Sequence, residues 1–185
     1  MSTLLHVSAS PRDAASDSRA LAGAFLDPYR RAHPDVAVEE LDLFDGTLSA
    51  VGHLAAEAKM AAWGGGQPSA EQQDAWKAGM PYVLKRWIDI ISQPGWLFSC
   101  TPDSGYSGPI RGRKAAVICT SGVYQPGAPL AYGDDFHAAF FNDRLRFAGF
   151  ADVAKIRWQP AVDTATRDTE TTAALQRAAE AGSHF

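Results

Sequence analysis

The chain opens with Thr3-Leu4-Leu5-His6-Val7-Ser8-Ala9-Ser10, an apolar run that ends in small hydroxyl residues. A helical pattern begins only after Ser18, where Leu21, Phe25 and Tyr29 recur every four residues. This order predicts a strand, a loop and then an amphipathic helix whose apolar stripe lies on a sheet. Pro28 falls inside the stripe, and we expect it to kink or loosen the last turn.

A second strand follows the first helix. Val36 and Val38, then Leu41 and Leu43, alternate loosely after His33-Pro34, which should end the helix. Strand, helix and strand in this order indicate the start of a parallel α/β sheet. The rest of the chain continues the alternation, and we expect a single domain over residues 1–185. The further predicted elements are a helix over Pro81–Ser92, a loop or hairpin over Trp96–Gly112, a buried strand over Lys114–Cys119, a helix between Asp135 and Gly149, a strand over Ala151–Trp158 and a helix over Thr169–Ala181.

The segment between Phe44 and Met80 breaks this alternation. Its only β-branched residues are Thr47 and Val51, and it holds no apolar run of strand type. Two helical stretches, Leu54–Trp63 and Ser69–Trp76, are separated by glycines and a proline. The sequence therefore predicts no strand in the place where an α/β sheet would have its third one.

Composition excludes several classes of protein. With 46% hydrophobic and 21% charged residues among 185, the chain can bury a core, and a net charge of −4 offers no cationic field for nucleic acid. We find no segment that could span a bilayer and no signal peptide. Two cysteines, Cys100 and Cys119, without a CxxC motif, fit a reducing compartment and are interpreted as structural thiols. We therefore expect a cytoplasmic protein.

Hydroxyl residues gather in the loop after the first strand. Ser10, Ser16 and Ser18 lie between a strand end and a helix start, where hydroxyls and free N–H groups form a neutral anion site suited to phosphate. The alternative is that Ser16 or Ser18 only caps the helix. A dinucleotide fingerprint and a P-loop are both absent from the sequence.

A second candidate lies after the buried strand. Thr120-Ser121-Gly122-Val123-Tyr124 occupies the carboxyl end of that strand, where open α/β sheets bind ligands. Small residues there would let a flat ring approach the backbone, or they form a plain turn. Trp96 and Phe98 are either an aromatic wall for a ligand or part of an interface core.

Other kinds of catalytic site are poorly supported. The five histidines share no metal-ligand spacing with a cysteine or a carboxylate, and Gly105-Tyr106-Ser107-Gly108 misses the GxSxG pattern of serine hydrolases. No acid, base or nucleophile stands out. Such a sequence fits a reaction whose chemistry is carried by a cofactor.

Five motifs in order resemble the FMN-dependent NADH:azoreductase and quinone reductase family over residues 3–160. They are Ser8-Ala9-Ser10-Pro11-Arg12 with Ser16-Asp17-Ser18, Val38-Glu39-Glu40-Leu41-Asp42-Leu43, Gly79-Met80-Pro81 with the helix that follows, Gln93-Pro94-Gly95-Trp96-Leu97-Phe98, and Thr120-Ser121-Gly122-Val123-Tyr124. The resemblance implies a flavodoxin-like α/β sandwich, with a parallel sheet of order 2-1-3-4-5. It also implies a homodimer with two active sites at the interface.

The resemblance assigns roles to individual residues. Ser10, Ser16, Asp17 and Ser18 would hold the FMN phosphate, with Asp17 using its backbone N–H. Thr120, Ser121 and Gly122 would contact the isoalloxazine. Phe98 would reach toward the flavin of the partner subunit, and Tyr124 would line the substrate side. NADH or NADPH would reduce the flavin and leave, and a quinone or azo compound would then take two electrons.

One departure from the family is large. The family has a helix, a central strand and a flavin loop before the Gly79-Met80-Pro81 helix, and roughly twenty of these residues have no counterpart here. Either the sequence lacks a segment of the real polypeptide, which the intact flanking motifs favour, or the protein is a shortened member whose sheet pairs differently. In the second case FMN affinity would suffer. Two other functions stay open: a flavin-binding or redox-sensing protein without turnover, and a hydrolase that uses Ser10.

Overall fold

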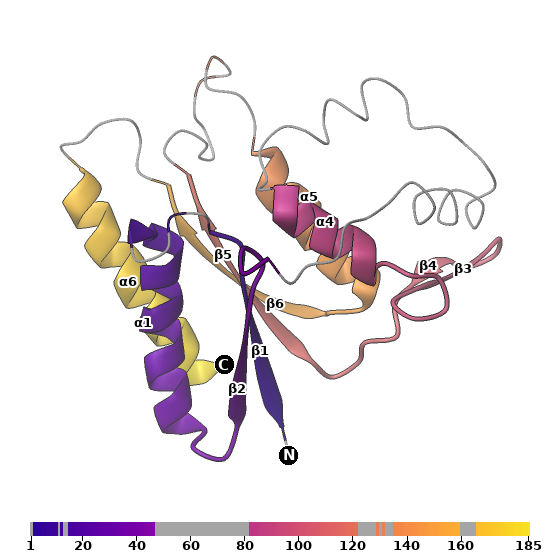
Figure 1. Ribbon diagram of the computed structural model, residues 1–185, viewed down its shortest axis with the longest axis horizontal. Helices are drawn as coiled ribbons and strands as arrows, with labels where there is room; N and C mark the ends of the chain where they lie inside the picture. Colours follow the sequence, from indigo (N-terminus) through magenta and orange to yellow (C-terminus); the bar gives the residue numbers. More distant parts are fainter. Residues whose placement is uncertain are drawn as a thin grey trace.

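The computed structural model describes residues 2–10, 12, 15–46, 82–121, 129, 131, 135–159 and 166–185. Strands lie in the middle, with α1 and α6 on one side and α4 and α5 on the other, which gives the three layers of an α/β sandwich (Figure 1). The elements are β1 (Thr3–Ser8), α1 (Asp17–Ala32), β2 (Ala37–Asp42), α4 (Tyr82–Ile91), β3 (Ser99–Thr101), β4 (Gly105–Ser107), β5 (Lys114–Thr120), α5 (Phe136–Ala148), β6 (Asp152–Trp158) and α6 (Arg167–His184).

These elements confirm the predicted α/β order with small corrections at the ends. The first helix starts at Asp17, before Ser18, because the side chain of Ser16 caps it, and it runs through Pro28 to its C-cap at His33. The last helix starts at Arg167 and ends at His184, so it is longer at both ends than predicted. The caps of α5 are as expected: Asp135 caps the start, and Gly149 ends the helix with a φ of 105°.

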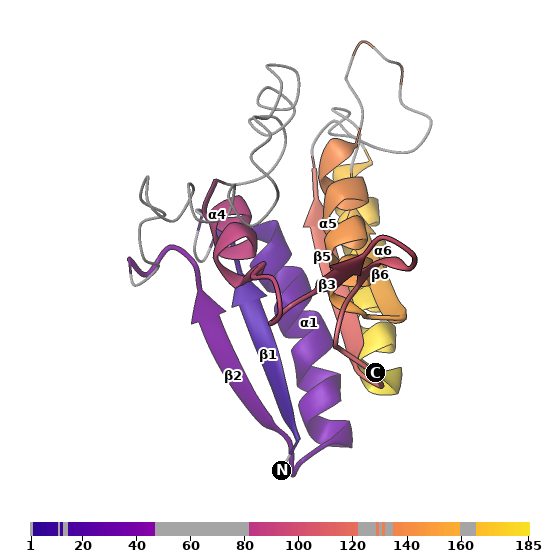
Figure 2. The same ribbon diagram turned by 90° about the vertical axis from the view of Figure 1, so that its right-hand side faces the viewer.

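Parallel pairing joins the strands two by two. β1 pairs with β2 from Thr3 opposite Ala37 to Ser8 opposite Asp42, and β5 pairs with β6 from Lys114 opposite Asp152. β3 and β4 form a short antiparallel hairpin. In the predicted sheet order 2-1-3-4-5, the pair β2-β1 corresponds to strands 2 and 1, and the pair β5-β6 corresponds to strands 4 and 5 (Figure 2). Within the described residues, no strand hydrogen-bonds to both β1 and β5. The predicted helices over 54–63 and 69–76 lie outside the described residues.

The main core lies between the sheet and the helices α1 and α6. Its buried side chains come from α1, β6 and α6, with Leu4, Val38, Ala116 and Ile118 of the other strands packed against them; the buried members are Leu21, Phe25, Leu26, Tyr29, Ile156, Trp158, Ala174 and Ala178. The stripe of Leu21, Phe25 and Tyr29 is the one predicted from the spacing. This core holds the N-terminal end of α1 close to the strand ends.

Helices α1 and α6 approach each other closely at one point. A Cβ atom on Gly182 would lie 2.0 Å from the backbone oxygen of Phe25, so only glycine fits there. Between Trp158 and α6, the indole Nε1 donates to Thr171 Oγ1 at 3.0 Å. The position of α6 on α1 is therefore set by backbone contact as well as by apolar packing.

The opposite face of the sheet is covered less completely. Val117 of β5 and Ile88 of α4 are buried there, whereas Leu5 of β1 is 53% exposed. Among the described residues, no helix is both long and apolar enough to cross a membrane.

Candidate functional site

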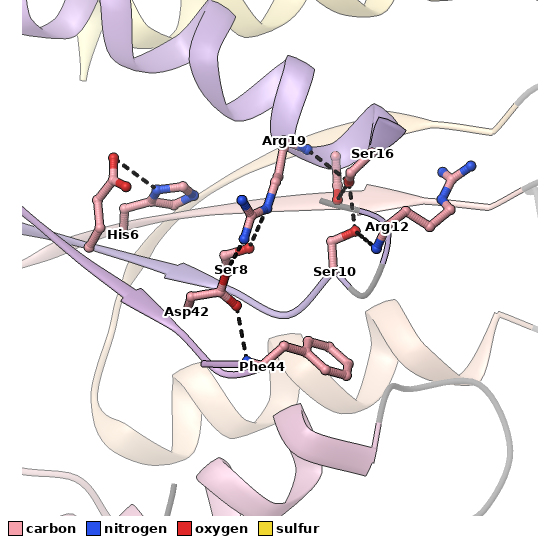
Figure 3. Close-up of polar contacts among 10 residues, drawn as sticks. His6, Ser8, Ser10, Arg12, Ser16, Arg19, Asp42 and Phe44 are labelled. Carbon is pink, nitrogen blue, oxygen red and sulfur yellow. Dashed lines mark hydrogen bonds and ion pairs between the residues drawn. The ribbon is translucent and has the colours of Figure 1, made fainter. Parts of the chain in front are cut away.

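Ser16 is the centre of a cluster of three serine hydroxyls at the start of α1. Its Oγ accepts from the backbone N–H of Arg19 at 3.2 Å and from the hydroxyl of Ser10 at 2.7 Å, and it lies 2.9 Å from the hydroxyl of Ser18. The residue is only 3% exposed. The structure therefore brings together the three predicted serines, and it shows that Ser16 is also the helix cap (Figure 3).

This arrangement fits the phosphate group of a flavin nucleotide. The N–H groups of Asp17 and Ser18 belong to the first turn of a 16-residue helix, where they have no carbonyl acceptor within the helix. Three hydroxyls beside them add donors that rotate to suit an anion, and the helix dipole favours negative charge. A neutral site of this kind needs no lysine to bind phosphate.

Two arginines hold the side chain of Asp17. Arg12 Nη2 lies 2.6 Å from Asp17 Oδ2, and Arg167 Nη2, from the start of α6, lies 3.6 Å from Asp17 Oδ1. The carboxylate is thus engaged by cations, which leaves the backbone N–H as the group that Asp17 can offer to an anion. This placement agrees with the role predicted for the residue, which stays a prediction.

The second predicted segment begins at the end of β5. Thr120 is the last residue of β5, and the N–H of Ser121 donates to the carbonyl of Trp158 at 3.0 Å. The arrowheads of β1, β2 and β5 point to the same edge of the molecule, so the serine cluster and this segment share the carboxyl edge of the strands (Figure 2). Gly122 and Tyr124 lie outside the described residues.

The carboxylate of Asp135 lies at the same edge, between β6 and α5. Asp135 accepts from the backbone N–H of Ala138 at 3.0 Å and from Arg157 Nη1 at 2.9 Å. Burial, helped by the negative charge of Asp135, raises the pKa of the Cys119 thiol to about 11. Burial also lowers the pKa of His137. The thiol is therefore protonated at neutral pH and is no nucleophile, which fits the predicted structural role of Cys119.

Phe98 and Trp96 differ in exposure. Phe98 is 4% exposed, and its ring centroid lies 4.6 Å from that of Phe147 in α5 and 5.8 Å from that of Tyr106. Trp96 is 85% exposed. Within this chain Phe98 is buried in an aromatic cluster with Phe147 and Tyr106. A place in an interface core and a reach toward the flavin of the partner subunit both stay predictions.

Two residues beside the serine cluster were assigned no role from the sequence, although one of them, Asp42, belongs to a family motif. Arg19 donates through Nε to Ser8 Oγ at 3.2 Å and forms an ion pair with Asp42, at the end of β2. The signal was present: Asp42 is a charged residue between Leu41 and Leu43 in a strand, and Arg19 is a cation in a first helical turn. The sequence alone does not predict that these two residues form an ion pair, because they become neighbours only when α1 packs beside β2.

Comparison with known proteins agrees with the fold. Residues 2–181 match a protein family described as having a flavodoxin-like fold. An FMN-dependent NADH:quinone oxidoreductase of Ruegeria pomeroyi is 39% identical over 187 residues, covering 89% of this chain and 92% of that protein. One of Nitratidesulfovibrio vulgaris is 33% identical, covering 86% and 87%. The crystal structure of an azoreductase from Bacillus anthracis is 25% identical, with a TM-score of 0.82 and complete coverage of both chains.

The alignment with the Ruegeria pomeroyi protein also contains gaps on the side of this chain. It spans 187 positions, although it takes up only 89% of the 185 residues here. Missing residues of this kind are what the departure from the family pattern predicts, and the segment concerned, residues 47–81, lies outside the described residues. The resemblance inferred from the five motifs is confirmed, and the chain belongs to the flavodoxin-like family of FMN-dependent NADH:quinone oxidoreductases and azoreductases.

Proposed function

We propose that this chain is an FMN-dependent NAD(P)H oxidoreductase that reduces quinones or azo compounds. The observation that carries the proposal is the serine cluster at the start of α1, in which the hydroxyls of Ser10 and Ser18 lie 2.7 and 2.9 Å from that of the buried Ser16. Bound FMN supplies the redox chemistry, taking two electrons from reduced nicotinamide and passing them to the acceptor. The residues of this chain bind and orient it.

In this proposal the two segments at the carboxyl edge share the work. Ser10, Ser16 and Ser18, with the backbone N–H of Asp17, bind the phosphate, while Thr120, Ser121 and Gly122 provide backbone contacts to the ring. Tyr124 lines the substrate side, and Phe98 reaches toward the flavin of the partner subunit. These residues belong to one FMN-binding domain over residues 1–185. Binding the phosphate at one end and the ring at the other fixes the orientation of the flavin, so that both substrates meet the same face.

The geometry around Ser10 argues against a serine hydrolase. Its hydroxyl lies 2.7 Å from Ser16 Oγ and 3.5 Å from the backbone nitrogen of Arg12. Neither group is a base that could take the proton of a nucleophilic serine. The Ser10 hydroxyl donates to Ser16, and neither of these contacts would activate it as a nucleophile.

We also propose that the protein is a cytoplasmic homodimer. Trp96 and Tyr106, on and beside the β3-β4 hairpin, are 85% and 61% exposed, and large exposed aromatic side chains are typical of subunit interfaces. Cys100 and Cys119 are both free, which fits a reducing compartment. A mass of twice 19.8 kDa in light scattering would support the dimer, and the monomer mass would refute it.

Anaerobic flavin titration tests the function. The protein is incubated with FMN, freed of excess flavin, and its visible spectrum is recorded before and after NADH or NADPH is added. A bound flavin spectrum that bleaches, and returns when a quinone or an azo dye is added, is the expected result. Bound flavin that never bleaches would select the non-catalytic flavin-binding alternative, and a colourless protein would refute FMN binding.

A further inference from the structure

The guanidinium of Arg19 connects the start of α1 to the ends of two strands. The backbone N–H of Arg19 donates to Ser16 Oγ at 3.2 Å, and its side-chain Nε donates to Ser8 Oγ, the last residue of β1, at 3.2 Å. Its Nη2 forms an ion pair with Asp42 Oδ2, at the end of β2. One residue thus contacts the helix cap and both strand ends (Figure 3).

Asp42 uses its second carboxylate oxygen on the turn that follows β2. Asp42 Oδ1 accepts from the backbone N–H of Phe44 at 3.0 Å, and the N–H of Leu43 donates to the carbonyl of Ser8 at 2.9 Å. Both oxygens of Asp42 are therefore engaged. Since a guanidinium is planar and its N–H directions are fixed, a bond to Ser8 together with one to Asp42 sets its orientation.

The serines of the cluster come from the end of β1 and from the start of α1, which are the two elements that the Arg19 side chain connects. Ser10 follows β1, whereas Ser16 and Ser18 belong to the start of α1. A hydroxyl that is displaced by about 1 Å from an anion no longer makes a normal hydrogen bond, because O–H···O distances in proteins lie at about 2.5–3.0 Å. The guanidinium itself is neutralised by Asp42, so its contribution is to geometry rather than to the charge of the site.

We propose that Arg19 and Asp42 are positioning residues for the flavin phosphate. They hold the first turn of α1 against the ends of β1 and β2, so that the hydroxyls of Ser10 and Ser16 converge. This inference rests on the proposed function, since the anion it concerns is the phosphate of FMN. In this role Arg19 and Asp42 do not contact the ligand; they act by holding the serines in place.

A second ion pair in the same elements provides matched controls. Arg30, near the other end of α1, lies 3.6 Å from Glu40 of β2, so this pair also joins α1 to β2 but at a distance from the serine cluster along the helix. Arg30→Gln is therefore the control for Arg19→Gln, and Glu40→Gln is the control for Asp42→Asn. Arg19→Lys keeps the charge but not the fork that reaches Ser8 and Asp42 together.

The test compares FMN with riboflavin, which lacks the phosphate. Dissociation constants of both are measured by quenching of flavin fluorescence, and thermal unfolding of the flavin-free variants is measured beside them. Losing one charge-assisted contact in the support of the site should weaken FMN binding about three- to tenfold in Arg19→Gln and Asp42→Asn. Riboflavin binding should change by less than about twofold, because the ring contacts are untouched. The control variants should leave both constants unchanged.

The outcomes separate the inference from the function. If the unmodified protein binds FMN no more tightly than riboflavin, the phosphate site itself is refuted. If it prefers FMN and Asp42→Asn keeps that preference, the positioning role is refuted while the function stands. Equal weakening of both flavins would also refute it, since that result indicates general damage. Should Arg19→Gln fail to fold, Arg19→Lys and Asp42→Asn decide the question, and both should bind FMN more weakly with riboflavin unchanged.

Discussion

Replacing Ser16 by alanine removes the hydroxyl on which the candidate phosphate site is built. Ser16 is 3% exposed, and its Oγ accepts from the N–H of Arg19 and the hydroxyl of Ser10. Loss of a helix cap of this type costs about 0.5–2 kcal/mol of unfolding free energy. Loss of a hydrogen bond to a charged phosphate costs about 1.5–3 kcal/mol of binding free energy. FMN binding should therefore weaken about 10- to 100-fold, since about 1.4 kcal/mol corresponds to a factor of ten.

A second substitution separates the two effects. Glycine at an N-cap costs only a few tenths of a kcal/mol relative to serine, so Ser16→Gly should fold almost as stably as the unmodified protein. It lacks the hydroxyl nevertheless, and its FMN affinity should fall as far as that of Ser16→Ala. Riboflavin affinity should be unchanged in both variants, because riboflavin carries no phosphate.

The assay is a fluorescence titration of each flavin, followed by turnover of NADH with a quinone at saturating FMN. Turnover per bound flavin should be nearly unchanged, since Ser16 is assigned to binding and not to the reaction. Unaltered FMN affinity in Ser16→Gly would refute the assignment of this hydroxyl to the phosphate. Loss of turnover at saturating FMN would refute a purely binding role.

Three further predictions concern charge, packing and the thiols. Asp17→Asn removes a negative charge beside the site and releases the two arginines that pair with it. FMN should therefore bind about three- to tenfold more tightly at low salt, with a steeper dependence of affinity on salt concentration. Weaker FMN binding in a titration over salt concentration would contradict this prediction. Gly182→Ala puts a Cβ 2.0 Å from a backbone oxygen of α1 and should cost about 1–3 kcal/mol in urea unfolding. Gly23→Ala, where a Cβ meets nothing within 4 Å in the same helix pair, should instead stabilise by about 0.5–1 kcal/mol, and equal effects would show that the packing is misread. Burial raises the pKa of Cys119 to about 11, so the thiolate fraction of this residue is small at about pH 8. Mass spectrometry after iodoacetamide treatment should therefore find the exposed Cys100 modified first. Faster alkylation of Cys119 would contradict its burial.

Local patterns in the sequence predicted the elements well. The four-residue spacing of Leu21, Phe25 and Tyr29 did become the buried stripe of α1, and the apolar run over Lys114–Cys119 became β5. Asp135 and Gly149 cap α5 as their residue types indicated. These features depend on contacts between near neighbours, so periodicity and capping chemistry are sufficient to predict them.

The candidate site was predictable in part. The serines were found because a hydroxyl-rich loop between a strand and a helix has a chemical meaning by itself. The order of five motifs then identified the family, which the relatives confirm. The prediction that no strand lies between Phe44 and Met80 falls almost entirely on residues outside the described part of the chain, and it stays a prediction.

Contacts between distant segments were decided by the tertiary structure alone. The pairing of Arg19 with Asp42, of Arg167 with Asp17, and of Phe98 with Phe147 joins residues that are far apart in the chain. A charged or aromatic residue carries no mark in the sequence that says which partner it will meet, because its partner depends on how helices and strands pack. The sequence by itself determined the elements, the serine loop and the family. The fold determined which side chains converge, since convergence depends on positions in space and not on spacing along the chain.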